Sequence, residues 1–340
     1  MKLIDLSVLI CVYLRLWRAS QFRKNIENRH SEQNSPGFTL IEILVGLGMA
    51  AIIISSLLGF MISVMNTEKN EQAKAISEQE IQAALDYISR DLQEAVYIYD
   101  AAGIDAIRTQ LPSSSARDRV PVMVFWKREL VADAVRDDTF VYSLVAYYLI
   151  KDSSSTWSKA ARIGRWQIKD GVTTSSNDST GVDCTGYPGS KYVRNYCPSP
   201  GFSLFDITQH GTLEQKMNRW IKNTVAYTND IVVLIDYIDQ TITNIPPATC
   251  PENVQNPDDS TQNLITWSKV PPPSFNNINT GKMTGFYVCV DRVNTIAQVF
   301  IRGNALARIN NNAGINYSSE RKSYFPTGSI KVQGRGYLYK

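Results

Sequence analysis

Few residues of this chain have the types and spacing that catalysis requires. Beyond residue 37 the chain has one histidine, His210, in the segment TQHGT. A serine hydrolase would need a serine on a G-x-S-x-G turn beside such a histidine, but GFSLF at 201–205 lacks the second glycine. The sequence has neither a P-loop nor a dinucleotide-binding fingerprint. We therefore expect no enzyme activity and no cofactor, and we interpret His210 as a surface or turn residue.

Cysteines are the second group with reactive side chains. Four of them follow residue 37: Cys184, Cys197, Cys250 and Cys289. An even number in loop-rich or strand-like surroundings favours two disulfides in an oxidising space outside the cytoplasm. Proximity in the sequence pairs Cys184 with Cys197 and Cys250 with Cys289, although four cysteines allow three connectivities. A four-thiolate zinc site is the alternative, but neither pair has the CxxC-like spacing of such sites.

Two polar segments are candidates for ligand binding. The acidic segment NPDDST at 256–261 lacks the ligand spacing of a calcium loop, so a solvated turn is favoured and no metal site is predicted. Three tyrosines, Tyr187, Tyr192 and Tyr196, lie in the segment between the first two of these cysteines. Loop packing explains them best, and a carbohydrate or partner surface is the alternative.

A single acid interrupts the longest apolar run. The stretch from Phe38 to Val64, FTLIEILVGLGMAAIIISSLLGFMISV, has Glu42 as its one charged residue. An unpaired carboxylate within a membrane is costly, so such an acid indicates a function and a partner. The alternative is an acid near a helix N-terminus that interacts with the helix dipole and reaches the lipid headgroups.

The apolar run is long enough to cross a bilayer. At 1.5 Å per residue, a helix over 38–65 exceeds the roughly 30 Å hydrocarbon core. Residues 1–37 contain six Lys or Arg and three acids, which places the N-terminal side in the cytoplasm and the rest of the chain outside. This local excess equals the +3 net charge of the whole chain, so the remainder is nearly neutral and nucleic-acid binding is not expected.

Helix-forming residues continue beyond the apolar run. No Gly or Pro occurs between residues 66 and 97, and apolar residues recur at helical spacing, at Ile81, Leu85, Ile88, Leu92 and Val96. We expect one helix from Phe38 to about Tyr97, roughly 60 residues and 90 Å long. Its second half would pack on its own domain.

Strand-like runs follow this helix, separated by long polar stretches. They lie at 120–126, 140–150, 161–168, 231–238, 284–290 and 293–302. A long helix followed by strands predicts an α+β fold, with the helix packed on a mostly antiparallel sheet. We expect residues 66–340 to form one extracytoplasmic domain, in which both disulfides join the long loops to this sheet.

The segment SPG-FTLIE at 35–42 resembles the cleavage and methylation motif of type IV prepilins and of the pseudopilins of type II secretion. An ordinary secretory signal has its cleavage site after the apolar stretch, whereas here the glycine precedes it. The resemblance implies that residues 1–37 are a prepilin leader, that a prepilin peptidase cuts between Gly37 and Phe38, and that Phe38 is then N-methylated. The new ammonium of Phe38 would pair with Glu42 of a neighbouring subunit and set the axial register of a filament.

The layout of the whole chain is similar to the larger minor pilins and pseudopilins, the PilW-like and J-type group. Residues 292–303 resemble their late hairpin, and the size and loop cysteines are similar to the cyanobacterial hormogonium polysaccharide secretion pseudopilins. The resemblance implies a single-pass protein of the inner membrane. Its implied partners are other pilins or pseudopilins of the same filament, the prepilin peptidase, the inner-membrane assembly platform and, in a polysaccharide system, polysaccharide.

Two functions follow as hypotheses. The first is a minor pilin or pseudopilin that primes or joins a type IV pilus-like or type II secretion-like filament. The second is a membrane-anchored binding module, an adhesin or a receptor for polysaccharide or DNA, for which the helix is only a display device. The large domain and its long loops favour a minor subunit over a major one.

Overall fold

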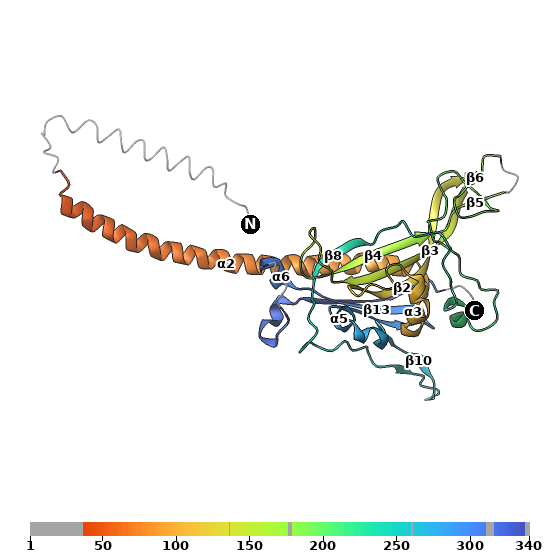
Figure 1. Cartoon of the computed structure of the whole chain (residues 1–340). Helices are drawn as coiled ribbons and strands as arrows, with labels where there is room; N and C mark the ends of the chain where they lie inside the picture. The colour runs from red at the N-terminus through yellow and green to blue at the C-terminus, as the bar shows by residue number, and fades with distance from the viewer. Residues whose placement is uncertain (1–36, 136, 176–178, 260, 311–315, 337–340) are drawn as a thin grey trace, which may run out of the picture. The chain divides into compact units, whose positions relative to one another are not determined.

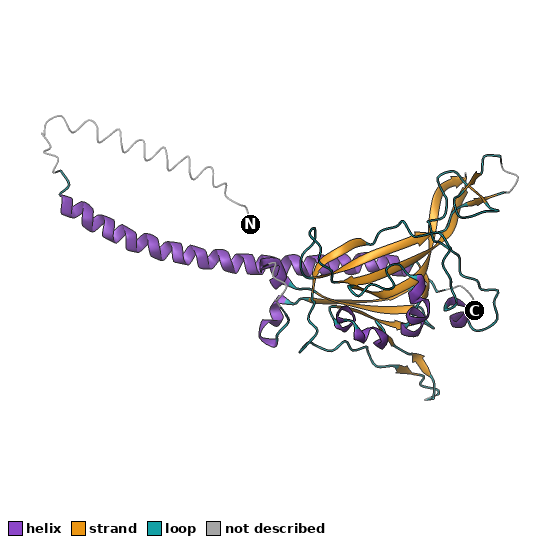
Figure 2. Ribbon diagram, in the orientation of Figure 1, coloured by secondary structure: helices purple, strands orange, loops and turns teal. Residues whose placement is uncertain are grey.

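The computed structural model describes residues 37–135, 137–175, 179–259, 261–310 and 316–336, without the side chains of 132–138. The proposed leader, up to residue 36, therefore lies outside the described residues. The chain divides into two units, Met1–Val64 and Met65–Lys340. The fold of the second unit is α+β, as predicted (Figures 1 and 2).

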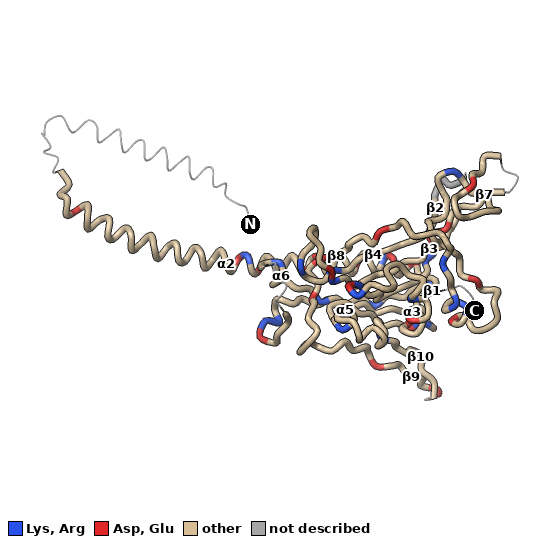
Figure 3. Tube along the Cα trace, viewed as in Figure 1, with Lys and Arg blue, Asp and Glu red and all other residues tan. Residues whose placement is uncertain are grey.

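The first long element is helix α2 (Leu40–Gln93). Every residue from 40 to 64 is exposed, and no charged residue occurs between Glu42 and Glu68, so Figure 3 shows this stretch almost entirely in tan. The helix ends at Gln93, so the prediction that it reaches Tyr97 is wrong. Residues Ala95–Ile98 form strand β1, which is fully buried and pairs antiparallel with β2. Its sequence, AVYI, suits a strand, and pairing with β2 decides between the two conformations.

Two antiparallel sheets form the body of the second unit. The five-stranded sheet has the order β1-β2-β3-β4-β8, with β2 (Arg119–Val135), β3 (Asp137–Ile150), β4 (Ala161–Lys169) and β8 (Val232–Ile238). The four-stranded sheet has the order β11-β12-β13-β14, with β11 (Ser268–Val270), β12 (Phe286–Asp291), β13 (Ile296–Arg302) and β14 (Thr327–Gln333). All six predicted strands are confirmed. The prediction of a single sheet is wrong, because β12 pairs with β11 and β13 in a sheet of its own; an isolated bridge, Ile238 to Gly303, links the two sheets.

Short elements fill the connections. Two small sheets are β5-β7-β6 (Thr173–Thr174, Lys191–Tyr192, Val182–Asp183) and β10-β9 (Asn263–Ile265, Val254–Gln255). The short helices are α3 (Ala101–Ile107), η1 (Arg108–Gln110), α4 (Leu213–Met217), η2 (Pro273–Asn277), α5 (Asn279–Lys282), α6 (Ala305–Asn310) and η3 (Ser319–Tyr324).

The second half of α2 lies in the core of the domain. Its predicted stripe, Ile81, Leu85, Ile88 and Leu92, is buried, with at most 2% of each residue exposed. Strand β14 approaches this face closely at Gly328, where a Cβ atom would lie 2.7 Å from Leu85 Cδ1. A glycine at this position therefore lets the sheet pack directly on the helix.

Candidate functional site

The predicted processing site lies at the start of α2. Gly37 and Phe38 are exposed and precede the helix, and Phe38 retains 79% of its accessible surface. Thr39 is followed by Leu40, the first helical residue. The Gly37–Phe38 bond therefore lies outside the helix and is exposed in the described part of the chain.

Thr39 and Glu42 form a capping box at this helix end. The Glu42 carboxylate accepts from the Thr39 backbone N–H at 3.4 Å and from its hydroxyl at 3.3 Å. In return the Thr39 hydroxyl accepts from the Glu42 N–H at 3.4 Å. This is the reciprocal S/T-x-x-E arrangement of a helix N-terminus, with long and therefore weak hydrogen bonds. The structure thus gives Glu42 a local role that the sequence analysis did not identify.

The capping box also affects how Glu42 could pair with a Phe38 ammonium. Glu42 Oε2 already turns back toward the backbone nitrogen of Thr39, next to the residue whose amine cleavage would expose. A new Phe38 ammonium would therefore arise close to the carboxylate of its own chain. A neighbouring subunit would have to compete with that intrachain pair.

Helix α2 is long and apolar enough to cross a membrane, by length and composition, and its most apolar part has no buried residue. Its apolar side chains between 38 and 65 are largely exposed, from 46% for Val64 to 82% for Leu40. A surface of this kind suits contact with lipid or with other apolar helices.

A buried ionic network anchors the opposite end of α2 to the five-stranded sheet. Asp91 is 7% exposed and accepts from Arg165 Nε on β4 at 2.6 Å, from the Tyr147 hydroxyl on β3 at 2.6 Å, and from Lys127 Nζ on β2 at 2.9 Å. Lys127 Nζ also lies 2.6 Å from Glu129. One carboxylate of the helix therefore binds three successive strands.

Burial and charge pairing oppose each other in this network. Burial alone would raise the pKa of Asp91, but the hydrogen bond and charge of Arg165, with hydrogen bonds from Tyr147 and Lys127, lower it below its usual 3.8. For Lys127, burial acts to lower the pKa, and the bonds to Glu129 and Asp91 raise it above its usual 10.5. The network is therefore fully charged near neutral pH.

The structure contains both predicted disulfides, with the predicted pairing. Cys184 is bonded to Cys197 and Cys250 to Cys289, with Cα atoms 5.7 and 5.6 Å apart. The first bond closes a loop of its own that contains β7 and directly follows β6, so the prediction that it joins a loop to the main sheet is wrong. The physical reason is that both cysteines lie in the same polar excursion between β4 and β8.

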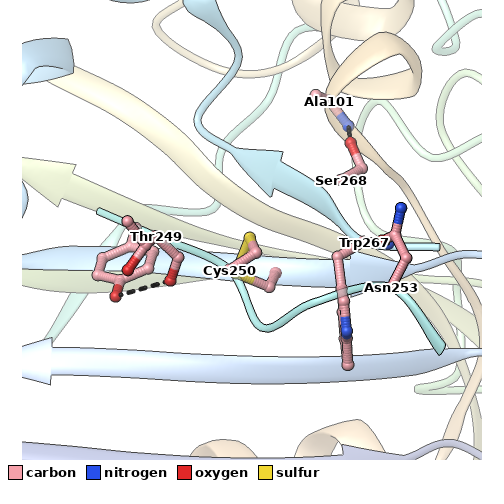
Figure 4. Close-up of a disulfide and its surroundings, with 8 residues drawn as sticks. Ala101, Thr249, Cys250, Asn253, Trp267 and Ser268 are labelled. Atoms are coloured by element: carbon pink, nitrogen blue, oxygen red, sulfur yellow. Dashed lines mark hydrogen bonds between the residues drawn. A yellow bond between two sulfur atoms is a disulfide. The ribbon is translucent and has the colours of Figure 1, made fainter. Parts of the chain in front are cut away.

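The second disulfide does join a loop to a sheet. Cys289 lies in the centre of β12 and is fully buried, and its bond fixes the segment that precedes β9 onto this strand (Figure 4). One residue before the bond, the Thr249 carbonyl accepts from the Tyr287 hydroxyl at 3.3 Å. Beyond it, Asn253 accepts from the Trp267 N–H at 3.0 Å. The disulfide and these two hydrogen bonds therefore hold the segment around Cys250, which has no long strand of its own.

Comparison with known proteins gives no relative to set beside this geometry. No family model, curated protein or solved structure matches the chain. The long apolar helix on an antiparallel sheet is compatible with a pilin-like fold. Any narrower assignment depends on the residues themselves.

The other candidate residues have local structural roles. His210 is exposed, and its carbonyl accepts from Arg219. Within NPDDST, the Asp259 carboxylate accepts from the N–H and the hydroxyl of Thr261, as expected for a turn. No group of three or more His, Cys, Asp or Glu residues that could hold a metal occurs in the part of the chain that the structure describes.

The sequence analysis did not identify the Asp91 network. A signal was available, because Asp91 lies between Ile88 and Leu92 on the buried stripe of the helix. A charged residue on a buried face requires a partner. The partners themselves, Lys127 and Arg165, are 36 and 74 residues away and were not recognisable from spacing.

Proposed function

We propose that the chain is a minor pilin or pseudopilin, a subunit that primes or joins a type IV pilus-like or type II secretion-like filament. The observation that supports this proposal best is the order of features at the N-terminus. The segment SPG-FTLIE stands immediately before an exposed apolar helix, and that helix continues into a folded α+β domain. Two structural features support it: Gly37 and Phe38 are exposed, and the Glu42 carboxylate accepts from the backbone N–H of Thr39, next to Phe38.

In this proposal the apolar part of α2 has two environments. It is held in the lipid of the inner membrane as a monomer, with the domain outside the cytoplasm. It is covered by the helices of other subunits in the filament. The exposed, uncharged surface between residues 43 and 64 suits both environments, since neither water nor charge has to be removed from it. The Asp91 network would hold the domain firmly on the helix while the subunit moves between them.

Photo-crosslinking from this surface tests the filament role. A benzophenone amino acid at Leu57, which is 60% exposed, should crosslink to a second pilin-like subunit in cells that express the companion genes. The control position is Val293, which is 80% exposed in the turn between β12 and β13. Crosslinks from Leu57 to lipid alone would contradict the filament role and favour the membrane-anchored binding module, which needs no contact between helices.

A further inference from the structure

A groove lined by exposed aromatic side chains runs along strand β8. Its first hollow, of about 580 Å³, lies between the second half of α2 and the loop before β4. Its second hollow, of about 710 Å³, lies over the end of β4. Tyr87, Val233 and Leu234 line both hollows, so the two are adjacent.

Two of the larger exposed aromatic residues of the described domain lie in this groove. Trp157 is 43% exposed and Tyr87 is 46% exposed, and they belong to different elements, a loop and a helix. By contrast, two tyrosines of the 184–197 loop make contacts within the protein. Tyr192 is buried, and the Tyr187 hydroxyl donates to the carbonyls of Ser199 and Phe202 at 2.7 and 2.9 Å. These two tyrosines thus pack in their loop, as the favoured interpretation of the sequence expected, whereas Tyr87 and Trp157 remain exposed in the groove.

The loop that presents Trp157 is fixed in place. Asp236 on β8 accepts from the Ser158 backbone N–H at 2.8 Å and from its hydroxyl at 2.7 Å. The backbone N–H of Trp157 donates to Ser154 Oγ at 3.3 Å. The backbone that carries Trp157 is thus held beside the strand, which reduces the entropy that a ligand would have to remove.

The polar groups of the groove do not favour a strongly charged ligand. In the first hollow Glu80 pairs with Arg308, whose guanidinium also stacks on Tyr237. The second hollow contains amide and hydroxyl groups, from Gln167, Asn229 and Ser199, together with residues of both charges. An open groove with two exposed aromatic side chains, edged by amides, hydroxyls and carboxylates, suits a chain whose rings have apolar C–H faces and polar hydroxyl edges.

We propose that this groove binds a neutral polysaccharide chain, with sugar rings stacked on Trp157 and Tyr87. The proposal is independent of the filament role, because binding can be measured with the purified chain alone. A peptide segment of another protein is the other class of occupant.

Titration of the detergent-solubilised full-length chain with neutral hexasaccharides tests the proposal. Cellohexaose, maltohexaose, xylohexaose and mannohexaose are added while tryptophan fluorescence and heat are recorded. We expect at least one of them to bind. Trp157→Ala should weaken that binding about tenfold or more. Tyr87→Phe should retain it, because the ring remains, and Tyr87→Ala should weaken it.

The matched control is Trp267→Ala, since Trp267 is a partly exposed indole on the other sheet, near Lys331. It should bind as the unchanged chain does, and thermal melting verifies that all variants are folded. Absence of binding by all four sugars at millimolar concentration would overturn the proposal, as would equal affinities of the Trp157→Ala and Trp267→Ala variants. A benzophenone at position 157 that crosslinks to a companion protein in cells would also overturn it and assign the groove to a protein partner.

Discussion

The guanidinium of Arg165 on strand β4 forms two hydrogen bonds with the carboxylate of Asp91 on helix α2, Nε to Oδ2 at 2.6 Å and Nη2 to Oδ1 at 3.2 Å. This pair connects helix α2 to the five-stranded sheet. It is largely buried, so its two members depend on each other. In a filament subunit, force applied to the helix would reach the domain through this contact.

Asp91→Asn should destabilise the domain by about 3 kcal/mol, because Arg165 and Lys127 would keep their charges in a buried site without their shared counter-ion. Thermal melting of the detergent-solubilised chain, followed by tryptophan fluorescence, measures the effect. The control is Asp86→Asn, an exposed acid on the same helix, which should change stability by no more than about 0.5 kcal/mol. Equal melting of the two variants would show that the network does not anchor the helix.

The domain should lose stability in acid. Against the effect of burial, Arg165 lowers the pKa of Asp91 and Lys127 lowers that of Glu129, from usual values of 3.8 and 4.5. A carboxyl with a lowered pKa stabilises the folded state above its unfolded pKa, and this contribution disappears as the pH falls through the lower folded pKa. Urea unfolding at pH 7 and at pH 3 should therefore give a lower midpoint at pH 3. In Asp91→Asn this difference should be smaller, and an unchanged difference would exclude Asp91 as its source.

The two disulfides should differ in their contribution to stability. The Cys250–Cys289 bond spans 39 residues, for which loop-closure entropy gives about 4 kcal/mol of stabilisation. The Cys184–Cys197 bond spans 13 residues, which gives about 3 kcal/mol. Double Cys→Ala variants of each pair, compared by urea unfolding, measure this order. Limited proteolysis should cut the segment 250–265 only when the Cys250–Cys289 bond is removed. Similar protection of that segment in both variants would mean that β12 holds it without the disulfide.

Variants at Glu42 and Thr39 can distinguish the capping role of Glu42 from the role of its charge in assembly. Glu42→Gln can still form the capping box but has no charge, whereas Thr39→Ala removes the cap partner and keeps the charge. If the carboxylate pairs with the Phe38 ammonium, Glu42→Gln and Glu42→Ala should both lose crosslinking to companion subunits, and Thr39→Ala should retain most of it. Membrane insertion should persist in all three, because none makes the helix less apolar by adding a charge. Normal assembly of Glu42→Gln would leave capping as the role of this residue.

Local patterns predicted the elements of this fold better than their pairing. The stripe from Ile81 to Leu92 and the six strand-like runs were sufficient to predict the long helix and the main strands. The end of the helix was missed because Ala95–Ile98 fits both a helical stripe and a strand, and only its pairing with β2 decides. The division into two sheets was missed for the same reason, since β12 has no local feature that directs it away from β8.

The site followed the same division. Gly37, Phe38 and Glu42 lie within six residues, so the processing and assembly sites could be predicted from their order, and neighbouring cysteines pair as proximity suggested. The Asp91 network and the Trp157 groove each join segments far apart in the sequence, so only the folded chain brings them together.

The central claim is that the chain is processed and assembled as a pilin, and the most direct measurement is mass spectrometry of its N-terminal peptide from the membrane fraction. If the chain is processed as a pilin, this peptide begins at Phe38 and carries one added methyl group on its amine. Gly37→Leu, expressed in the same cells, should retain residues 1–37 and serves as the control. A terminus between residues 55 and 65, as secretory cleavage after the apolar stretch would give, would contradict the account, as would an uncleaved wild-type chain in cells that process other prepilins.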